Sequence, residues 1–299
     1  MKDTIPCLSI MEKIEWPEGK QFAVFLSHDV DRVRKTYQFF THFLIEKRAY
    51  HLFSLFEKSN PYWCFEKIMD IEKKYDIRST FFFLKETKKL NIFHPSRYGL
   101  SLGHYDFNEP AIREIIKKLD EGGWEIGLHG SFNTYNNKDL MLKEKKELEK
   151  VLRKSVIGIR QHFLNLEIPK TWEMQKSIGF CYDSTFGYED KIGFRDERYM
   201  PFRPFDDHFL IIPLIIMDGS LFSYYKNDRS RWDAVSGAIE FAEKKRGVIS
   251  FLWHQRVFNE KEFPGWSKFY EKIINECKGK NAWFATGKEV YDRINTFRM

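Results

Sequence analysis

Apolar runs that indicate buried strands alternate along this chain with segments of helical periodicity. Residues 22–26 form the first run, and its unbroken apolar character is typical of a strand covered on both faces of a parallel sheet. Later runs lie at residues 79–84, 124–128, 156–159, 180–185, 210–214, 248–254 and 283–286. Helical periodicity separates them, for example at residues 110–121, 138–153, 169–177 and 232–245. This alternation predicts a parallel, barrel-like α/β fold of seven or eight strands, with residues 1–299 forming a single domain.

The segment at residues 32–56 is aromatic and basic, and its pattern predicts a helix. Tyr37, Phe40, Phe43 and Leu44 recur in it at spacings of three to four residues. Such an apolar stripe is typical of core packing, so we expect this helix to pack on the barrel. Contact with a membrane surface is the alternative that remains open.

Composition and charge argue against a disordered chain and against a nucleic-acid-binding protein. The 299 residues are 42% hydrophobic and 17% aromatic, which is typical of a globular chain. The net charge of +6 comes from basic residues interspersed with acidic ones, without a basic block that would favour nucleic acid. The four cysteines form no C-x-x-C pair, so we expect reduced thiols. With neither a signal peptide in residues 1–20 nor an integral membrane segment, we predict a cytoplasmic protein.

Polar residues follow five of the predicted strands directly. Asp29 and Asp31 stand two positions apart, so an extended strand would point both carboxylates the same way. Two converging carboxylates repel unless a cation or a shared proton lies between them. The polar residues that follow the other strands are His129, Arg160, His162, Asp183 and His254. Because the carboxyl ends of parallel strands meet at one edge, these residues predict a single shared site.

In this order and spacing, the motifs resemble those of the polysaccharide deacetylases, the NodB-homology group of carbohydrate esterases. Residues 27–31 resemble the first motif in its Asp-x-Asp form, and residues 125–131 resemble the second. The remaining matches are the strand at residues 79–82, Arg160 of the third motif, Asp183 of the fourth, residues 252–254 of the fifth and the closing turn at 286–289. The resemblance covers a core of about residues 22–290 and implies a distorted (β/α) barrel.

The resemblance also implies roles for these residues. Asp29 would be the general base, kept ionised and oriented by Arg160, and His254 would protonate the departing amine. Asp183 would orient His254 and tune its pKa. Asp31 and His129 would bind a divalent metal, with Zn²⁺ expected first and Co²⁺, Ni²⁺ or Mn²⁺ as alternatives.

One position departs from the family pattern. The second motif normally carries two histidines four residues apart, but Asn133 follows His129 at that spacing. An amide oxygen is a poorer ligand than imidazole for a borderline-soft cation. Three alternatives stay open: Asn133 is a weak ligand, another residue such as His162 supplies the third ligand, or the metal is absent. His28 is a further imidazole beside the predicted site.

Taken together, these features predict a metal-dependent hydrolase that removes an N-acetyl group from a sugar in lipopolysaccharide or capsule biosynthesis. Its partner would be a saccharide or a sugar precursor, with Arg195 and Trp253 as substrate-binding residues. One alternative is a related C–N hydrolase that acts on a non-sugar amide. The other, favoured by Asn133, is a metal-free saccharide-binding or scaffold protein on the same fold.

Overall fold

The computed structural model describes residues 14–86, 102–205 and 207–296. Residues 1–13 lie outside the described part, and with them Cys7 and most of the N-terminal segment that was expected to lack a signal peptide. The other three cysteines, Cys64, Cys181 and Cys277, are free thiols.

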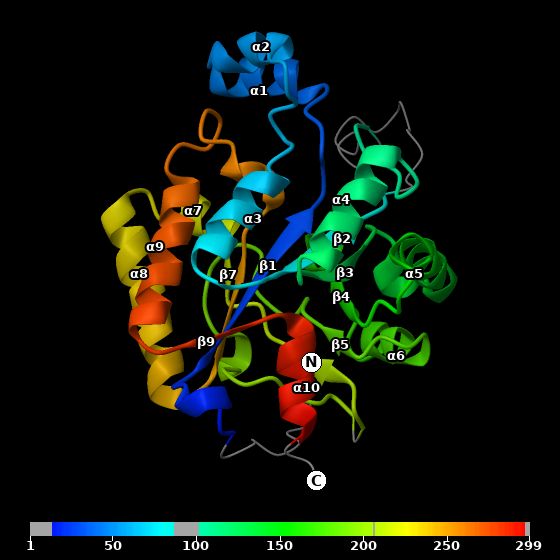
Figure 1. Ribbon diagram of the computed structural model, residues 1–299, viewed down its shortest axis with the longest axis vertical. Coiled ribbons are helices and arrows are strands. Elements are labelled where there is room, and N and C mark those ends of the chain that lie inside the picture. The colour runs from blue at the N-terminus through cyan, green and yellow to red at the C-terminus, as the bar shows by residue number, and fades with distance from the viewer. Residues whose placement is uncertain (1–13, 87–101, 206, 297–299) are drawn as a thin grey trace.

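One curled sheet of parallel strands forms the centre of the molecule (Figure 1). Its strands are β1 (Ala23–Val30), β2 (Thr80–Leu84), β3 (Glu125–Gly130), β4 (Gly158–Gln161), β5 (Tyr182–Asp183), β6 (Leu210–Ile211), β7 (Ile216–Met217), β8 (Val248–Leu252) and β9 (Trp283–Ala285). The order is β6-β5-β4-β3-β2-β1-β8-β7, and β9 pairs with the first half of β1. The predicted distorted (β/α) barrel is therefore confirmed. The two-residue strand β7 was not predicted.

The buried hydrophobic residues form two clusters, and strand β1 contributes side chains to both. Val24 and Leu26 pack in the larger cluster, between the sheet and the helices. Phe25 packs in the smaller cluster inside the barrel, together with Phe82 and Tyr182. Because side chains alternate along a strand, the odd-numbered residues of β1 face the barrel interior and the even-numbered ones face the helix layer. Asp29 and Asp31 continue the inward-facing set.

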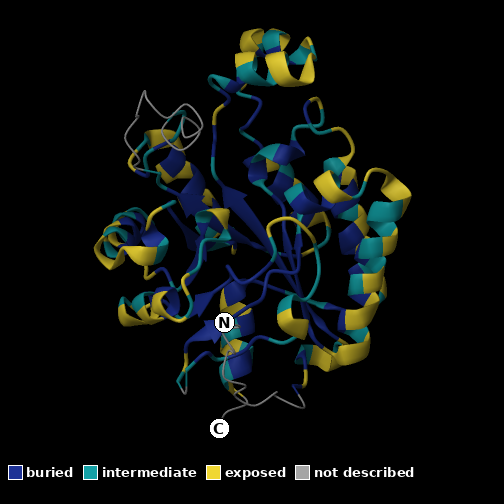
Figure 2. Ribbon diagram, turned by 180° about the vertical axis from the view of Figure 1, so that it is seen from behind, coloured by how far each residue is buried: buried dark blue, intermediate teal, exposed yellow. Residues whose placement is uncertain are grey.

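Helices surround the sheet and turn their exposed faces outward (Figure 2). They are α3 (Phe65–Lys74), α4 (Pro110–Glu121), α5 (Lys138–Leu152), α6 (Lys170–Ser177), α7 (Asp218–Tyr224), α8 (Asp228–Lys245), α9 (Trp266–Gly279) and α10 (Gly287–Thr296). Short 3-10 helices lie at η1 (Pro17–Gly19), η2 (Ser54–Phe56), η4 (Thr134–Asn136), η5 (His162–Leu164), η6 (Arg195–Glu197) and η7 (Gln255–Phe258). Among the described residues, none of these helices combines the length and apolar character needed to cross a bilayer.

Local sequence explains where typical helices begin and which face they bury. Helix α4 has Pro110 in its first turn, where the missing N–H costs no hydrogen bond. Its buried face consists of Ile112, Ile115, Ile116 and Leu119. Helix α5 begins after Asn137, whose side chain accepts a hydrogen bond from the backbone N–H of Leu140.

The segment at residues 32–56 differs from the prediction. It forms two short helices, α1 (Gln38–Glu46) and α2 (Tyr50–Phe53), followed by η2. We call residues 38–56 the apical helices, because they project from one end of the molecule (Figure 1). The expectation of core packing is wrong for the stripe, since Phe40 is 57% and Leu44 71% exposed.

A buried polar network fastens the apical helices to the barrel. Lys35 Nζ lies 2.6 Å from Glu262 Oε2 and 2.7 Å from His51 Nδ1, while the Tyr62 hydroxyl donates to Glu262 Oε1 at 3.1 Å. Burial opposes ionisation of Glu262, but hydrogen bonds with His42 and Lys35 and the charge of Lys35 lower its pKa to about 2. The contact is thus an ion pair at neutral pH.

We predict that Glu262→Ala destabilises the protein by about 3–5 kcal/mol, because it leaves the Lys35 ammonium buried without its counter-charge. Denaturant unfolding measures this loss. Since folding depresses the pKa of Glu262 from 4.5, the difference from wild type should persist above about pH 4.5 and shrink as the pH falls towards 2.

Glu57→Ala is the matched control, because Glu57 pairs with the exposed Lys261. It should cost less than about 1 kcal/mol. Equal and small losses in both variants would contradict the assignment of the Lys35–Glu262 pair as the anchor.

Candidate active site

Arg160 and Asp29 form a buried ion pair at the carboxyl edge of the sheet. Arg160 Nη1 donates to Asp29 Oδ1 at 2.8 Å, and the two side chains are 0% and 3% exposed. The rest of the guanidinium is held by the backbone oxygen and the hydroxyl of Ser184, and it lies over the ring of Phe82. Asp29 is therefore fixed in one orientation by a cation that cannot lose its proton.

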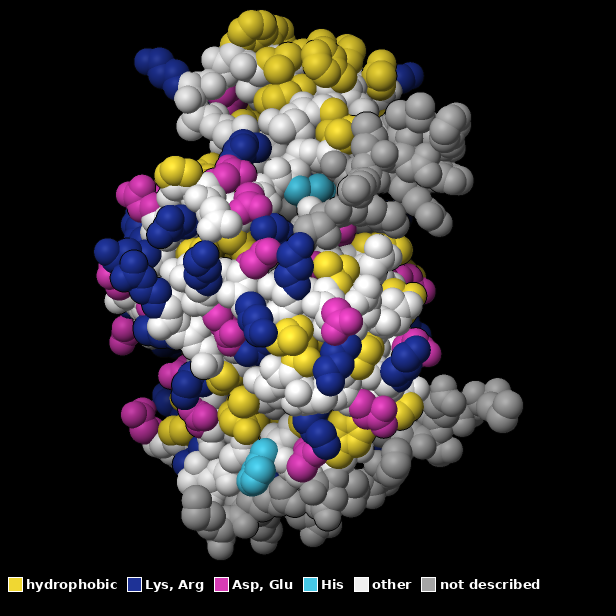
Figure 3. Space-filling model, turned by 90° about the vertical axis from the view of Figure 1, so that its right-hand side faces the viewer, with side chains coloured by type: hydrophobic (Ala, Val, Ile, Leu, Met, Phe, Trp, Pro, Cys, Tyr) yellow, Lys and Arg dark blue, Asp and Glu magenta, His cyan; other side chains and the backbone are white. Residues whose placement is uncertain are grey.

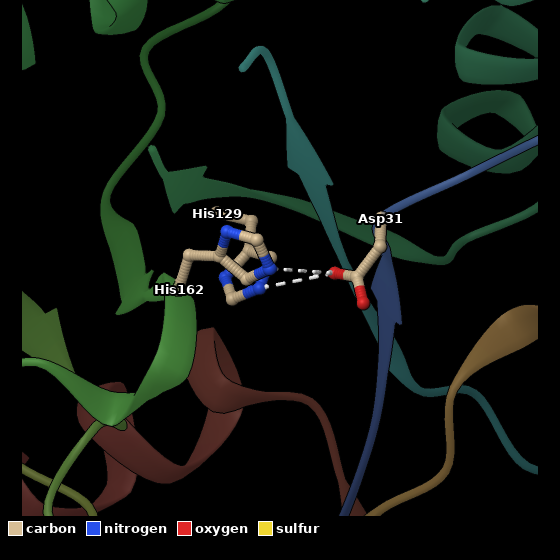
Figure 4. A group of neighbouring side chains, drawn as sticks. All are labelled: Asp31, His129 and His162. Atoms are coloured by element: carbon tan, nitrogen blue, oxygen red, sulfur yellow. Dashed lines mark ion pairs between the residues drawn. The ribbon is translucent and has the colours of Figure 1, made fainter. Parts of the chain in front are cut away.

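Asp31, His129 and His162 converge beside this pair (Figure 4). His129 Nε2 lies 3.3 Å and His162 Nε2 4.0 Å from Asp31 Oδ1. One potential ligand atom from each of the three residues falls within 4.8 Å of the others. Asp31 Oδ1 has no hydrogen-bond partner within the described ranges. An orphaned carboxylate oxygen facing two imidazoles suits a divalent cation.

The hydrogen bond of His129 leaves one ring nitrogen available to a metal. His129 Nδ1 lies 2.9 Å from the backbone oxygen of Arg160, which can only accept, so Nδ1 carries the proton. In the neutral ring, Nε2 then presents its lone pair to Asp31 and Asp29. A backbone carbonyl that fixes the tautomer in this way is typical of metal-ligating histidines.

The structure separates the candidates for the third metal ligand. His162, at the end of β4, has its ring 5.1 Å from that of His129. Asn133 is exposed and precedes η4. His28 faces the helix layer, where its ring nitrogens contact the Trp253 backbone oxygen and the Glu72 carboxylate at 2.7 and 2.9 Å. His28 is therefore a core residue, which corrects the idea that it is a spare imidazole of the site.

Asp218, not Asp183, orients His254. Asp218 Oδ1 lies 2.7 Å from His254 Nδ1, and Oδ2 accepts the backbone N–H of His254 at 2.7 Å. Asp183 instead accepts hydrogen bonds from Thr185 and Gln175. The expected contact of Asp183 with His254 is thus wrong, because Asp183 sits at the end of β5, and four strands separate β5 from β8 in the sheet order.

These contacts shift the pKa values of the site residues. Burial lowers the pKa of His254, but the charge and hydrogen bond of Asp218 outweigh it and raise the pKa to about 9. Burial raises the pKa of Asp31, but the facing imidazoles of His129, His254 and His162 bring it well below the usual value. A protonated His254 Nε2 therefore faces an ionised Asp31, whose Oδ2 is 3.6 Å away.

The sequence prediction missed two residues at this site. Asp218 follows β7, and Glu86 follows β2 by two positions, so both obey the same rule of polar residues after strands. Glu86 Oε2 lies 3.7 Å from His162 Nδ1 and accepts the backbone N–H of Phe132 at 3.0 Å. Glu86 thereby supports the outer side of the His162 ring.

The two predicted substrate-binding residues lie apart from this group. Trp253 is fully buried and packs against Phe269 and Tyr270, so no face is open to a sugar, which corrects that expectation. Arg195 is half-buried, lies over the ring of Phe186 and donates to the Gly187 backbone oxygen at 3.1 Å. Within the described ranges, no hydrogen bond or ion pair joins Arg195 to the residues around Asp31.

Comparisons of the whole fold give clear matches, although no protein-family model and no curated protein matches the sequence. A Mycobacterium smegmatis protein described as a polysaccharide deacetylase matches at a TM-score of 0.65 and 16% identity, covering 98% of this chain and 96% of that one. An allantoinase matches at 0.62 and 14%, covering 97% and 98%. A Pseudomonas aeruginosa protein, also described as a polysaccharide deacetylase, matches at 0.62 and 12%, covering 94% and 93%. The chain has the polysaccharide deacetylase fold.

We predict that Asp218→Asn lowers the pKa of His254 in the metal-free protein from its value of about 9, because the imidazolium loses its strongest charge interaction while its burial stays the same. NMR titration of the imidazole measures this change. Since the folded-state pKa is raised, the pair stabilises the fold fully below about pH 6.5, and this stabilisation is lost as the pH rises through about 9.

Asp183→Asn is the control and should leave the titration of His254 in place. If Asp183→Asn shifts the pKa of His254 and Asp218→Asn does not, Asp183 is the residue that orients His254, as the sequence predicted.

Proposed function

We propose that this protein is a metal-dependent hydrolase that removes an N-acetyl group from a saccharide. The observation that carries the proposal is the convergence of three units at one sheet edge: the Asp29–Arg160 pair, the Asp31–His129–His162 group and the His254–Asp218 pair. They supply the base, the ligands and the acid that amide hydrolysis needs. The fold matches to polysaccharide deacetylases support the same reaction.

Asp29 and His254 divide the proton transfers. Asp29, held by Arg160, takes a proton from the attacking water with its second oxygen, Oδ2, which the guanidinium does not bind. His254, protonated through Asp218, gives its Nε2 proton to the departing amine nitrogen. Arg160 and Asp218 are positioning residues, since they act by holding the Asp29 carboxylate and the His254 ring in the required orientation.

A divalent cation fits the donor set of the site. Asp31 Oδ1, His129 Nε2 and His162 Nε2 would hold it, and two imidazoles with one carboxylate are a ligand set that Zn²⁺ uses in catalytic sites. When bound, the cation would polarise the acetamide carbonyl and lower the pKa of a bound water. Zn²⁺ is our first choice, and Co²⁺, Ni²⁺ and Mn²⁺ are the alternatives.

His162 is our choice for the third ligand. It takes the place that the second histidine of the family motif would otherwise fill, because Asn133 is exposed whereas the His162 ring faces Asp31. The carboxylate of Glu86 on the far side of the ring would hold the orientation of His162. A scaffold protein without metal would not need this arrangement.

Sugars of lipopolysaccharide or capsule precursors are the proposed substrates. A second candidate function is hydrolysis of a non-sugar C–N bond, which the match to an allantoinase favours. The two functions share the base, acid and metal ligands, so only the substrate separates them.

We predict that purified wild-type protein binds about one equivalent of a divalent ion and that His162→Ala lowers the affinity about 10²-fold. Asp31→Ala should abolish binding, because it removes the only carboxylate of the set. Elemental analysis and calorimetric titration with Zn²⁺ measure both effects.

Asn133→Ala is the matched control and should bind metal as wild type does. A loss confined to Asn133→Ala would make the amide the third ligand instead. No binding by wild type after dialysis against Zn²⁺, Co²⁺ and Ni²⁺ would favour the saccharide-binding alternative.

We predict that the metal-loaded protein releases acetate from at least one member of a panel of N-acetylated sugars, nucleotide-linked and lipid-linked ones included. Asp29→Asn should lower kcat by about 10³-fold or more without unfolding the protein, because no other group of the site can take the water proton. Acetate release and circular dichroism measure the two effects.

Allantoin belongs in the same panel. Turnover of allantoin without acetate release from any sugar would select the second candidate function. Undiminished turnover by Asp29→Asn would disprove the assignment of the base.

A further inference from the structure

The apical helices, residues 38–56, have their polarity reversed relative to the other helices of the fold. The buried residues in α1, α2 and η2 are Gln38, His51 and Ser54, all of them polar. The large exposed hydrophobic side chains there are Phe40, Leu44, Ile45, Phe53, Leu55 and Phe56, which are 57%, 71%, 77%, 70%, 40% and 86% exposed. Helices of a water-soluble fold bury the opposite set.

This apolar surface is continuous and convex. Figure 3 shows hydrophobic side chains gathered over the projecting end of the molecule, with lysine or arginine side chains at its margins. Six of the nine large exposed hydrophobic residues in the described ranges lie within residues 40–56. The polar network around Lys35 and Glu262 fixes the base of the projection, so the apolar side chains are held outward. Large exposed hydrophobic side chains that gather in one place indicate a binding surface.

The charges around the surface identify the class of partner. Residues 34–58 carry five lysines and arginines against two acidic residues, and of the five only Lys35 is buried, in its pair with Glu262. Lys47 and Lys58 are exposed, and neither forms an ion pair with another residue of the described ranges. Exposed apolar side chains bordered by free cations match the interface of an anionic lipid bilayer, where the chains enter the acyl boundary and the cations meet phosphates.

A second copy of this chain fits the surface less well. A two-fold interface would place the convex surface against an identical convex surface with the same cationic margin. Such contact would leave like charges facing one another at the rim.

We propose that the apical helices dock the protein onto an anionic membrane surface, with Phe40, Leu44, Ile45, Phe53 and Phe56 entering the lipid. The strands run with their carboxyl ends towards the apical helices, and α1 begins seven residues after Asp31 (Figure 1). Docking therefore brings the edge of the sheet that carries the site towards the bilayer. This proposal does not depend on the reaction, because it concerns binding to lipid alone.

Flotation with vesicles tests the proposal on the full-length protein. Wild type should bind vesicles of phosphatidylcholine with phosphatidylglycerol, and more weakly those of phosphatidylcholine alone. Ile45→Ser/Phe56→Ser should lower the partition coefficient at least about tenfold on both, because two apolar side chains no longer leave water. Lys47→Glu/Lys58→Glu should lower it about tenfold on the anionic vesicles only.

Tyr224→Ser is the matched control, since Tyr224 on α7 is 63% exposed but lies outside the apical helices. It should bind as wild type does, and thermal unfolding should show that every variant is folded. Absence of binding by wild type, or equal binding by Ile45→Ser/Phe56→Ser, would overturn the proposal. Light scattering completes the test by measuring the oligomeric state. If wild type is a dimer that binds no vesicles, and Ile45→Ser/Phe56→Ser is a monomer, the surface belongs to a second copy of the chain instead.

Discussion

The buried charge of Arg160 is the constraint on which the site depends. Its guanidinium is out of contact with water, so each N–H must find a partner inside the protein. The Asp29 carboxylate on β1 and Ser184 next to β5 supply those partners, while Phe82 on β2 covers one face. The guanidinium of Arg160, on β4, thus contacts residues on or next to three other strands, β1, β2 and β5. Removing the Asp29 side chain would leave the Arg160 charge buried and without a partner. The same ion pair therefore stabilises the fold and fixes the orientation of the base.

Strand alternation decides which polar residues reach the site. Asp29 and Asp31 share the inward-facing side of β1 and its continuation, whereas His28, immediately before Asp29, faces the helix layer and belongs to the network of Glu72. The same rule separates Trp253 from His254, because consecutive residues after β8 point to opposite sides, one into the core and one towards Asp31. Adjacency in sequence therefore does not make an imidazole or an indole part of this site.

Much of this could be predicted from the sequence. The apolar run before Asp29 and the polar residues at strand ends correctly indicated a parallel sheet that brings Asp31, His129 and Arg160 to one edge. Asp218 escaped notice because β7 has only two residues, too few to show any periodicity. A short strand is defined by its pairing with β8, a long-range contact that no local pattern records.

The apical helices show a second limit of periodicity. A stripe at three- to four-residue spacing predicts a helix with one apolar face, but it does not say what that face meets. The answer lies in the opposite face: Lys35, His51 and Glu262 form a satisfied, buried polar network, so the inner side of these helices is already occupied by polar groups. The apolar face can only point outward. Burial in a core does not explain why positions 53 and 56 carry phenylalanine, since neither Phe53 nor Phe56 contributes to a core. Exposing these apolar side chains to water is unfavourable, and no contact within the described part of the fold offsets it. Such an exposed apolar surface implies a partner outside the chain.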